Sequence, residues 1–440
     1  MGDMPRSTSD GVHGSEPGGR AASVRDTARS LRPVPESFAS PIHDPRVVAR
    51  VGVWLGIAVL LAFLTGVFSH LAQDPVPWLP LGEGPFSPHL AWVYRVTQGV
   101  HVAAGLVCLP LLLGKLYAAY PALFARPAVR GPAHALERAS VALLVASASF
   151  QVVTGVLNTF QVYPWEFSFR RVHFAVAWVL VGSMLVHVAV KLPTILRVVR
   201  AGLDDDAPRS GDTAGPRTAS PAVAEPSVPA DGAAERAGAA RRGFLAAIGA
   251  GVLGLSALTL GQTVRPLAPL AVLAPRDPRI GPQGLPVNKT ARGAGIGPEA
   301  VGPGWRLELV GPDRVLRLDR DALLAMPRHE AVLPIACVEG WSATAAWSGV
   351  RLRDLVALVG APEDAAVLVE SLQESGLYRA SELAPEYVWH PDTLLALRID
   401  GEDLHLDHGF PARLIAPNRP GVRQTKWVAR IEVLGSGGDA

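Results

Sequence analysis

Four long apolar runs in the first half of the chain constrain its fold more than any other feature. They cover residues 47–69, 91–113, 140–160 and 172–192. Each is close to the roughly 20 residues that a helix needs to cross about 30 Å of hydrocarbon. Since a lipid-exposed backbone must satisfy its own hydrogen bonds, we predict helices. Residues 45–200 should therefore form an all-α bundle of four transmembrane helices.

The basic residues predict the orientation of this bundle. They gather at one end of the predicted helices: Arg46, Arg50, Lys115, Arg126, Arg130, Arg138, Lys191, Arg197 and Arg200. Residues 71–90 contain no Lys or Arg. Basic residues favour the cytoplasmic side, so the N-terminus should be cytoplasmic and the loops around Asp74 and Trp165 should face outward. Arg170 and Arg171 oppose this assignment but are outnumbered.

The remaining segments of this half are polar, apart from a fifth apolar run. Residues 1–44 are rich in Gly, Ser, Pro and Arg, which predicts a disordered cytoplasmic tail, and residues 201–240 should form a flexible linker. Arg241 and Arg242 then precede an apolar run that ends near residue 261. This resembles a twin-arginine export signal, and residues 241–264 are just long enough for an anchor helix. The alternative is an ordinary basic flank on a transmembrane helix. Both interpretations place the C-terminal domain outside.

Histidines inside these spans suggest haem ligands, because an imidazole in hydrocarbon is costly. His173 and His187 lie 14 residues apart, so they share one helix face with about 21 Å of rise between them. This spacing resembles the two-haem helices of b-type cytochromes, which implies two haem b groups. We predict that His70 pairs with His173 near the outer surface and that His101 pairs with His187 more deeply, although His89 could replace His70. The alternative for each is an interfacial or hydrogen-bonded imidazole.

The third run has no histidine but several polar side chains, which we expect to pack helices rather than bind a ligand. They are Ser147, Ser149, Gln151, Thr154 and Asn158.

After about residue 265 the apolar segments become short and are punctuated by Pro, Gly and Asp. This pattern is typical of a mixed α+β domain, which should occupy residues 265–440. The predicted strands are 306–310, 332–336, 366–369, 413–415 and 427–433, and the predicted helices are 319–325 and 352–359.

Cys337 is the only cysteine of this domain, and Cys108 lies in the membrane part, so the sequence contains no disulfide framework. Cys337 follows the apolar run 331–336 and precedes Gly340, which allows a close approach of the backbone. A thiolate in such a turn is a suitable ligand for a soft or high-valent metal. The alternative is a small core residue.

The sequence from Cys337 to Ser342, Cys-Val-Glu-Gly-Trp-Ser, is followed at residues 347–352 by Trp-Ser-Gly-Val-Arg-Leu. Together they resemble the molybdopterin-binding domain of the sulfite oxidase superfamily, in which this cysteine is the molybdenum ligand. The resemblance is closest to the branch of bacterial periplasmic methionine sulfoxide reductases. Sulfite oxidases place an arginine shortly after the cysteine, whereas this chain has Gly340, Trp341 and Ser342. This departure argues against sulfite oxidation.

The resemblance extends over residues 285–434 and implies further cofactor-binding positions. A dianionic pterin phosphate would suit guanidinium, ammonium and free backbone N–H groups. The matching residues are Asn288, Ser371, His408, Arg413, Arg423, Gln424, Thr425 and Lys426.

These features predict a molybdopterin oxidoreductase in the bacterial inner membrane, with electrons relayed through b haems to or from the quinone/quinol pool. An oxygen atom would be exchanged with a small-molecule or protein-borne substrate outside the membrane, and sulfoxide reduction is favoured. Oxidation of sulfite or another sulfur compound is the alternative, and a non-catalytic haem relay or docking protein is the alternative from another class. The net charge of +2 gives no indication of nucleic-acid binding.

Overall fold

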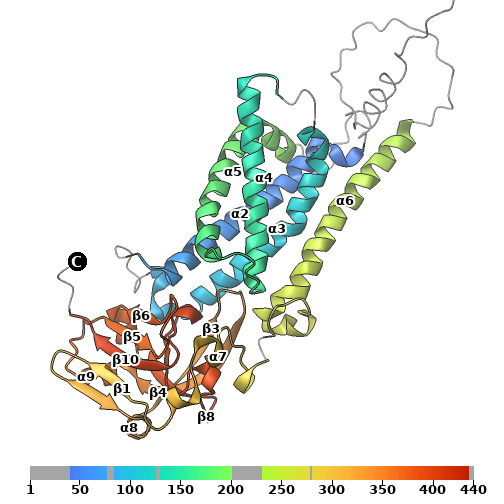
Figure 1. The fold of residues 1–440 in the computed structure, drawn as a ribbon. Coiled ribbons are helices and arrows are strands. Elements are labelled where there is room, and N and C mark those ends of the chain that lie inside the picture. Colours follow the sequence, from blue (N-terminus) through green and yellow to red (C-terminus); the bar gives the residue numbers. More distant parts are fainter. Residues whose placement is uncertain (1–39, 77–83, 125–128, 201–229, 278–279, 436–440) are drawn as a thin grey trace, which may run out of the picture.

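The computed structural model describes residues 40–76, 84–124, 129–200, 230–277 and 280–435 (Figure 1). Most of the predicted tail and linker, residues 1–39 and 201–229, therefore lies outside the described residues.

Among the described residues, five helices are long and apolar enough to cross a membrane, which indicates a membrane protein. They are α2 (Pro45–Gln73), α3 (Val93–Leu123), α4 (Pro132–Thr159), α5 (Phe169–Arg200) and α6 (Ala230–Thr259). The first four each contain most of one predicted run and extend beyond it at one or both ends. Helix α6 begins at Ala230, so residues 230–240, which we expected in the linker, are helical. This segment is rich in alanine, the best helix former, and it follows Pro229.

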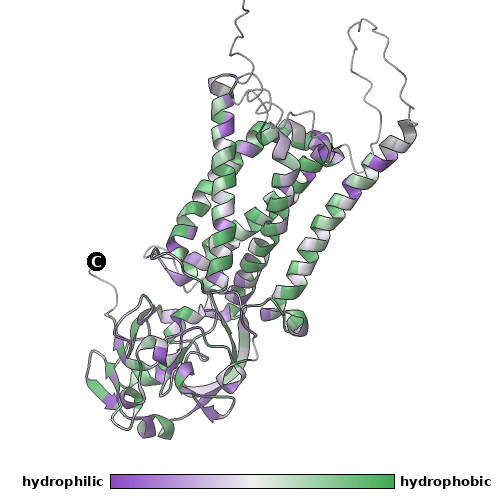
Figure 2. Cartoon of the chain, turned by 45° about the vertical axis from the view of Figure 1, so that its right-hand side comes forward, coloured by the Kyte–Doolittle hydropathy of each residue, from purple (hydrophilic) through white to green (hydrophobic). Residues whose placement is uncertain are grey.

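The outer surface of these helices is apolar. Large side chains such as Trp54, Leu64 and Leu253 are 61, 57 and 72 % exposed, and the helices are mostly green in Figure 2. Exposure of this kind along a whole helix suits a lipid environment rather than water.

Packing between the helices is closest where small residues lie. Helix α2 packs on α3 and α5, and α4 packs on α5 and α3. Helix α6 runs beside α3 (Figure 1), where Ile248 lies over Gly114 at a place in which any Cβ would be only 2.4 Å from its Cδ1. Glycine at this position therefore permits the contact.

The C-terminal domain contains two sheets. The first has the order β2-β1-β10-β5-β6, and the second has the order β3-β4-β7-β8 with β9 also paired to β7. The strands are β1 (Leu307–Val310), β2 (Val315–Leu318), β3 (His329–Ala336), β4 (Ser342–Arg351), β5 (Val367–Ser371), β6 (Ala380–Leu383), β7 (Leu394–Ile399), β8 (Glu402–Asp403), β9 (Arg413–Ile415) and β10 (Val428–Val433). The short helices are α7 (Ala291–Ala294), α8 (Arg320–Ala325), α9 (Leu352–Ala357) and α10 (Pro385–Val388).

One core of buried apolar side chains joins the sheets and helices of this domain. Leu307, Leu355, Val367 and Leu397 belong to it and are each 0 % exposed. All five predicted strands and both predicted helices correspond to observed elements. Strands β2, β4, β6, β7 and β8 were not predicted.

The domain lies at one end of the bundle (Figure 1), next to the loops that the charge pattern predicts to face outward. The Asn418 side chain accepts a hydrogen bond from the Tyr94 N–H at 2.8 Å and donates to the carbonyls of Pro85 and Ser87. The Tyr387 hydroxyl donates to the Phe86 carbonyl. These contacts hold the domain against the end of α3 and the segment before it.

Candidate functional site

Cys337 lies in the tight turn between β3 and β4. Antiparallel pairing continues to Ala336 and Ser342, and the Cys337 N–H donates to the Trp341 carbonyl at 2.9 Å. Gly340 completes the turn with a φ of +99°, a conformation that favours glycine. The Cys337 side chain is buried, at 1 % exposure.

The turn packs directly on a membrane helix. A Cβ on Gly340 would lie 2.8 Å from a methyl group of Val102 on α3. The predicted close approach at Gly340 is therefore to α3, because a larger residue would push the turn away from the bundle.

Both signs of charge surround the Cys337 thiol. Burial, and then the neighbouring Glu339, hold the pKa of this thiol well above its usual range. Arg413 and Lys426 are close enough to interact electrostatically with it in the opposite sense. A metal that replaces the thiol proton would therefore have cationic side chains nearby.

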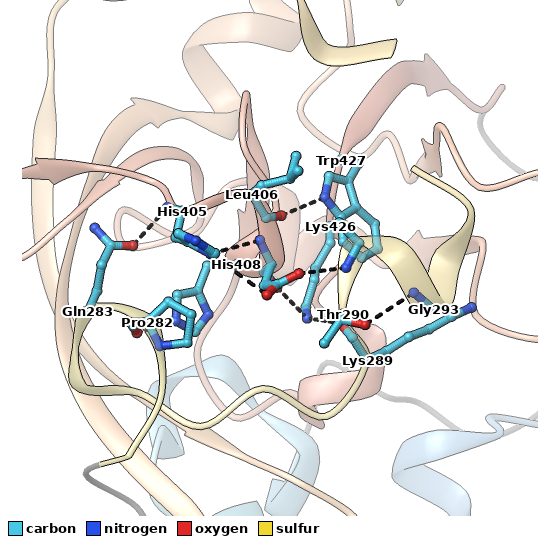
Figure 3. Close-up of polar contacts among 12 residues, drawn as sticks. Pro282, Gln283, Lys289, Thr290, Gly293, His405, Leu406, His408, Lys426 and Trp427 are labelled. Atoms are coloured by element: carbon cyan, nitrogen blue, oxygen red, sulfur yellow. Dashed lines mark hydrogen bonds and ion pairs between the residues drawn. The ribbon is translucent and has the colours of Figure 1, made fainter. Parts of the chain in front are cut away.

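Arg413 and Lys426 form the centre of a buried cationic cluster. Lys426 Nζ donates to the carbonyls of Lys289 and Asp407, each at 2.8 Å (Figure 3). Arg413 donates to the His408 carbonyl at 3.2 Å, and its Nε has no hydrogen-bond partner among the described residues. Burial lowers the pKa of Arg413 to about 9 and that of Lys426 well below its usual value. Because neutral carbonyls are the main partners of these two buried cations, an anionic partner would stabilise them.

Three other predicted residues join this cluster. His408 Nε2–H donates to the Pro282 carbonyl at 2.7 Å (Figure 3), and burial lowers the His408 pKa to about 4. The Ser371 hydroxyl donates to the Lys426 carbonyl at 2.8 Å. Asn288 directly precedes Lys289, and its Oδ1 accepts the Lys289 N–H at 2.9 Å. Segments far apart in sequence therefore meet beside Cys337.

The remaining three predicted residues direct their side chains elsewhere. Arg423 donates to the Glu382 carbonyl, toward the domain–membrane junction. Gln424 Nε2 donates to the carbonyls of Ala416 and Arg419, and the Thr425 hydroxyl bonds Ser381. The Arg423 and Gln424 N–H groups also donate within the loop, to the carbonyls of Pro420 and Gly421.

These residues fit a molybdopterin. Cys337 supplies a thiolate ligand, and the unpartnered Arg413 Nε and the Lys426 ammonium supply donors for an anionic group. Among the described residues, no three His, Cys, Asp or Glu side chains come together as a metal site.

A cavity lies inside the bundle, between α2, α3, α4 and α5. His101 and His173 line it and face each other, with ring centroids 6.3 Å apart and ring planes at 80°. Two imidazoles on opposite sides of one metal would be separated by about 6 Å, given metal–nitrogen bonds of about 2 Å and about 1.1 Å from nitrogen to ring centre. The observed separation fits this arrangement.

Hydrogen bonds orient both imidazoles for such a role. His101 Nδ1–H donates to the Ala62 carbonyl at 2.8 Å. The Thr154 hydroxyl donates to the Phe150 carbonyl, so its oxygen accepts from His173 Nδ1–H at 2.9 Å. Each ring therefore keeps its Nε2 lone pair available. Thr154 was expected only to pack helices, so sequence analysis missed this role.

The structure brings together a different pair of histidines from the pairs predicted from depth. His70 lies in the last turn of α2 and stacks on Phe174, with ring centroids 3.7 Å apart. His187 is near Lys115 and Lys191 instead of His101. The observed helices do not begin and end where the apolar runs do, so depths counted from the runs differ from those in the structure. The His89 ring lies against His390, with ring centroids 5.0 Å apart.

The cavity and the cysteine turn are in contact. Val338, the residue after Cys337, lines the cavity, and its carbonyl accepts a hydrogen bond from Gln98 on α3 at 2.8 Å. Gln98 is one turn from His101 in the same helix. The two candidate cofactor sites are therefore neighbours.

Comparison with known proteins agrees with the geometry of the domain. Residues 296–437 match the family model "Oxidoreductase molybdopterin binding domain". The putative protein-methionine-sulfoxide reductase subunit YedZ1 of Azospira oryzae is 35 % identical over 116 residues, which are 26 % of this chain and 43 % of that protein. The mitochondrial sulfite oxidase of Mus musculus is 31 % identical over 157 residues, 29 % of each chain. This chain thus spans less than half of either relative.

Two further proteins are similar to part of this chain. The uncharacterized oxidoreductase YuiH of Bacillus subtilis is 31 % identical over 130 residues, which are 29 % of this chain and 64 % of that protein. The solved structure of sulfane dehydrogenase SoxCD from Paracoccus pantotrophus is 26 % identical, with a TM-score of 0.28; the match covers 30 % of this chain and 38 % of that chain.

Asn288 lies outside the residues that the family model matches. Residues 296–437 form a molybdopterin-binding oxidoreductase domain, the enzyme class that the sequence predicts.

Proposed function

We propose that this chain is a membrane-bound molybdopterin oxidoreductase that exchanges electrons between a substrate site at Cys337 and a haem in the bundle cavity. The main support for this proposal is the contact between the two sites, in which Val338, the residue after Cys337, lines the cavity. A bound molybdenum would supply two-electron oxygen-atom transfer, and a haem would pass electrons singly.

Cys337 would hold the molybdenum, and Arg413 and Lys426 would bind the pterin phosphate. His408, Ser371 and Asn288 would complete the cradle, because their contacts fix the segments around Lys426. Arg423, Gln424 and Thr425 would fix the shape of the loop beside Lys426, because the Arg423 and Gln424 N–H groups donate within it. This division follows from where each side chain points.

His101 and His173 would be the axial ligands of one haem b. The cavity has a polar end toward the domain, formed by Ser69, Gln73, Gln98, Asn158, Thr159 and Arg170. Its other end is apolar, with Leu55, Val59, Leu112 and Leu180. A haem has carboxylates on one edge and an apolar opposite edge, so this division of polarity supports it. The one pair of adjacent histidine rings among the described residues that line this cavity supports one haem there, where two were predicted for the bundle.

Sulfoxide reduction is the favoured reaction. It takes two electrons and two protons, breaks the S–O bond and releases water. The turn has no cation at Gly340, Trp341 or Ser342, and the nearby Arg276 is already paired with Glu339 at 2.9 Å, so an anionic sulfite would find little support there. Oxidation of sulfite or another sulfur compound remains the alternative, since the matched relatives include sulfite oxidases.

The domain would lie outside a bacterial inner membrane, exported after its cofactor is loaded, with Arg241 and Arg242 as a twin-arginine signal. Quinol would supply the electrons to the haem. The position of the domain at the end of the bundle with the fewest basic residues supports this orientation.

The experiment uses haem absorption of the purified full-length protein as the reporter. Reduced protein is mixed anaerobically with methionine sulfoxide, and oxidised protein is mixed separately with sulfite. Haem reoxidation by methionine sulfoxide that disappears in Cys337→Ser would establish the proposed function. Haem reduction by sulfite would reverse the direction. A haem band without either response, together with absence of molybdenum, would favour a non-catalytic relay.

A further inference from the structure

Three consecutive residues of the cysteine turn are bound by groups outside the matched domain. The Val338 carbonyl accepts from Gln98, and the Gly340 carbonyl accepts from the Thr263 hydroxyl. Between them, the Glu339 carboxylate is bound by Gln161 and Arg276. Helix α3, the loop between α4 and α5 and the segment after α6 therefore hold the turn that carries Cys337.

The Glu339 carboxylate is the most heavily bound of these groups. Its Oε2 accepts from Arg276 Nε at 2.9 Å and from Trp341 Nε1 at 3.0 Å, and its Oε1 accepts from Gln161 Nε2. The side chain is only 4 % exposed. A buried carboxylate needs such partners, because an unpaired buried charge is strongly unfavourable. These three side chains therefore hold the Glu339 carboxylate in place, and the carboxylate also interacts with the Cys337 thiol.

The three side chains form a closed network from three separate parts of the chain. Arg276 also donates to Gln161 Oε1, so Arg276 and Gln161 bind each other as well as Glu339. Gln161 lies in the loop between α4 and α5, and Arg276 lies in the segment that connects α6 to the domain. A guanidinium can make these two contacts at once because its N–H groups are fixed in a fork.

We propose that Arg276 and Gln161 form a latch on Glu339 that positions the Cys337 turn over the bundle cavity and so sets the rate of electron exchange between the two sites. This inference rests on the proposed function for its kinetic consequence. Arg276 and Gln161 are positioning residues, since they act through Glu339 and neither contacts the Cys337 thiol.

The kinetic test separates electron exchange from chemistry at Cys337. Turnover of methionine sulfoxide is measured with reduced viologen, a soluble donor that can reach the domain directly. Reoxidation of the reduced haem by methionine sulfoxide is measured by stopped flow. Arg276→Met, which keeps the apolar stem, should leave viologen-linked turnover within about twofold and slow haem reoxidation about tenfold or more, because a small misplacement of a reacting group is costly.

Two further variants and a control sharpen the result. Gln161→Asn tolerates the positive φ of +57° at this position but is too short to reach Glu339, and it should act like Arg276→Met. Arg276→Lys keeps the charge without the fork and should restore part of the rate. The control is Arg317→Met, which removes an exposed arginine paired with Glu308 at 3.2 Å on strand β2. Equal loss of both rates in Arg276→Met, or no loss in either, would overturn the latch.

A second readout does not depend on the proposed function. In cofactor-free protein with Cys108→Ala, the rate of Cys337 alkylation by a maleimide reports how tightly the turn is held. Gln161→Asn, which leaves the Arg276 charge in place, should raise this rate about tenfold, since 1.4 kcal/mol of lost positioning corresponds to that factor. An unchanged rate would overturn the latch even if no haem or turnover is found. A raised rate without turnover would support the latch and reject the proposed function.

Discussion

The bundle cavity and the cysteine site are both buried, but they differ in charge. Arg170 is the only lysine or arginine among the described residues that line the cavity, and the two facing imidazoles there have their Nδ1 atoms bonded to neutral groups. The cysteine site instead contains Arg413 and Lys426 with few acidic partners. A neutral site suits a group that only changes its oxidation state, whereas a cationic site suits a dianionic pterin phosphate.

The two sites therefore depend on different structural features. The cavity depends on helix packing, which determines which imidazoles face each other. The cysteine site depends on segments that are distant in sequence and are held together by backbone carbonyls. A substitution in one of the two sites should therefore affect that site and not the other.

The largest effect is expected at Cys337. Cys337→Ser should lower sulfoxide turnover by about 10³-fold or more, because a hydroxyl is a poor replacement for a thiolate ligand of a soft metal. The haem spectrum should be unchanged. Metal analysis and anaerobic turnover check this, with Cys108→Ala as the control. Normal molybdenum content and turnover in Cys337→Ser would refute the assignment.

Loss of one axial ligand should remove the haem. His101→Leu or His173→Leu should abolish the haem absorption band, whereas His70→Leu and His187→Leu should retain it, because only the first pair faces across the cavity. Haem content per polypeptide is the measurement. If His70→Leu lost the haem and His101→Leu kept it, the pairing expected from depth would be restored.

His408 should make the domain sensitive to acid. Its pKa of about 4 in the folded chain lies below the usual 6.5, so between these values the unfolded chain binds the extra proton. Stability therefore falls as the pH falls from about 6.5 to 4, by about 3 kcal/mol from this group. Urea-dependent pulse proteolysis of cofactor-free protein measures it.

In His408→Gln the loss of stability over the same pH range should be smaller by this amount. His405→Gln, which removes an exposed histidine three residues earlier, is the control for loss of an imidazole. An identical acid dependence in His408→Gln and the wild type would contradict the prediction.

The smallest effect is expected at Thr154. Thr154→Val removes the hydroxyl that accepts from His173 Nδ1–H, and it should weaken haem retention about tenfold, as for other groups that orient a metal ligand. Haem transfer to apomyoglobin measures retention. The control is Thr65→Val, whose hydroxyl bonds its own helix at Leu61. Equal retention in both variants would mean that Thr154 only packs the helices.

Much of the fold was predictable because local composition dictates it. A run of apolar residues long enough to span a bilayer has few alternatives to a helix, and most of each of the four runs lies in an observed helix. The strands with strong apolar patterns, such as β3 and β10, were predicted as well. Strand β4 was missed because Ser, Thr, Ala and Gly dilute its apolar pattern between residues 342 and 349.

The candidate site was only partly predictable. The motif around Cys337 and the residues His408, Arg413 and Lys426 could be identified from the sequence and lie together in the structure. Arg423 could not be distinguished from Arg413 by residue type, since the direction of its side chain depends on the junction with the membrane helices. Arg276 and Gln161 carried no signal, because each looks like an ordinary polar residue in a connecting segment.

The sequence by itself determined the membrane helices, the α+β domain and the thiol at the end of a strand, because these follow from hydropathy, spacing and a local motif. The tertiary structure alone decided that His101 faces His173, that Thr154 orients one of these rings, and that Glu339 binds Arg276 and Gln161. These contacts depend on where each helix begins, how it rotates against its neighbours and how the domain docks on the bundle. Such quantities are set by packing across the whole molecule and leave no trace in local sequence.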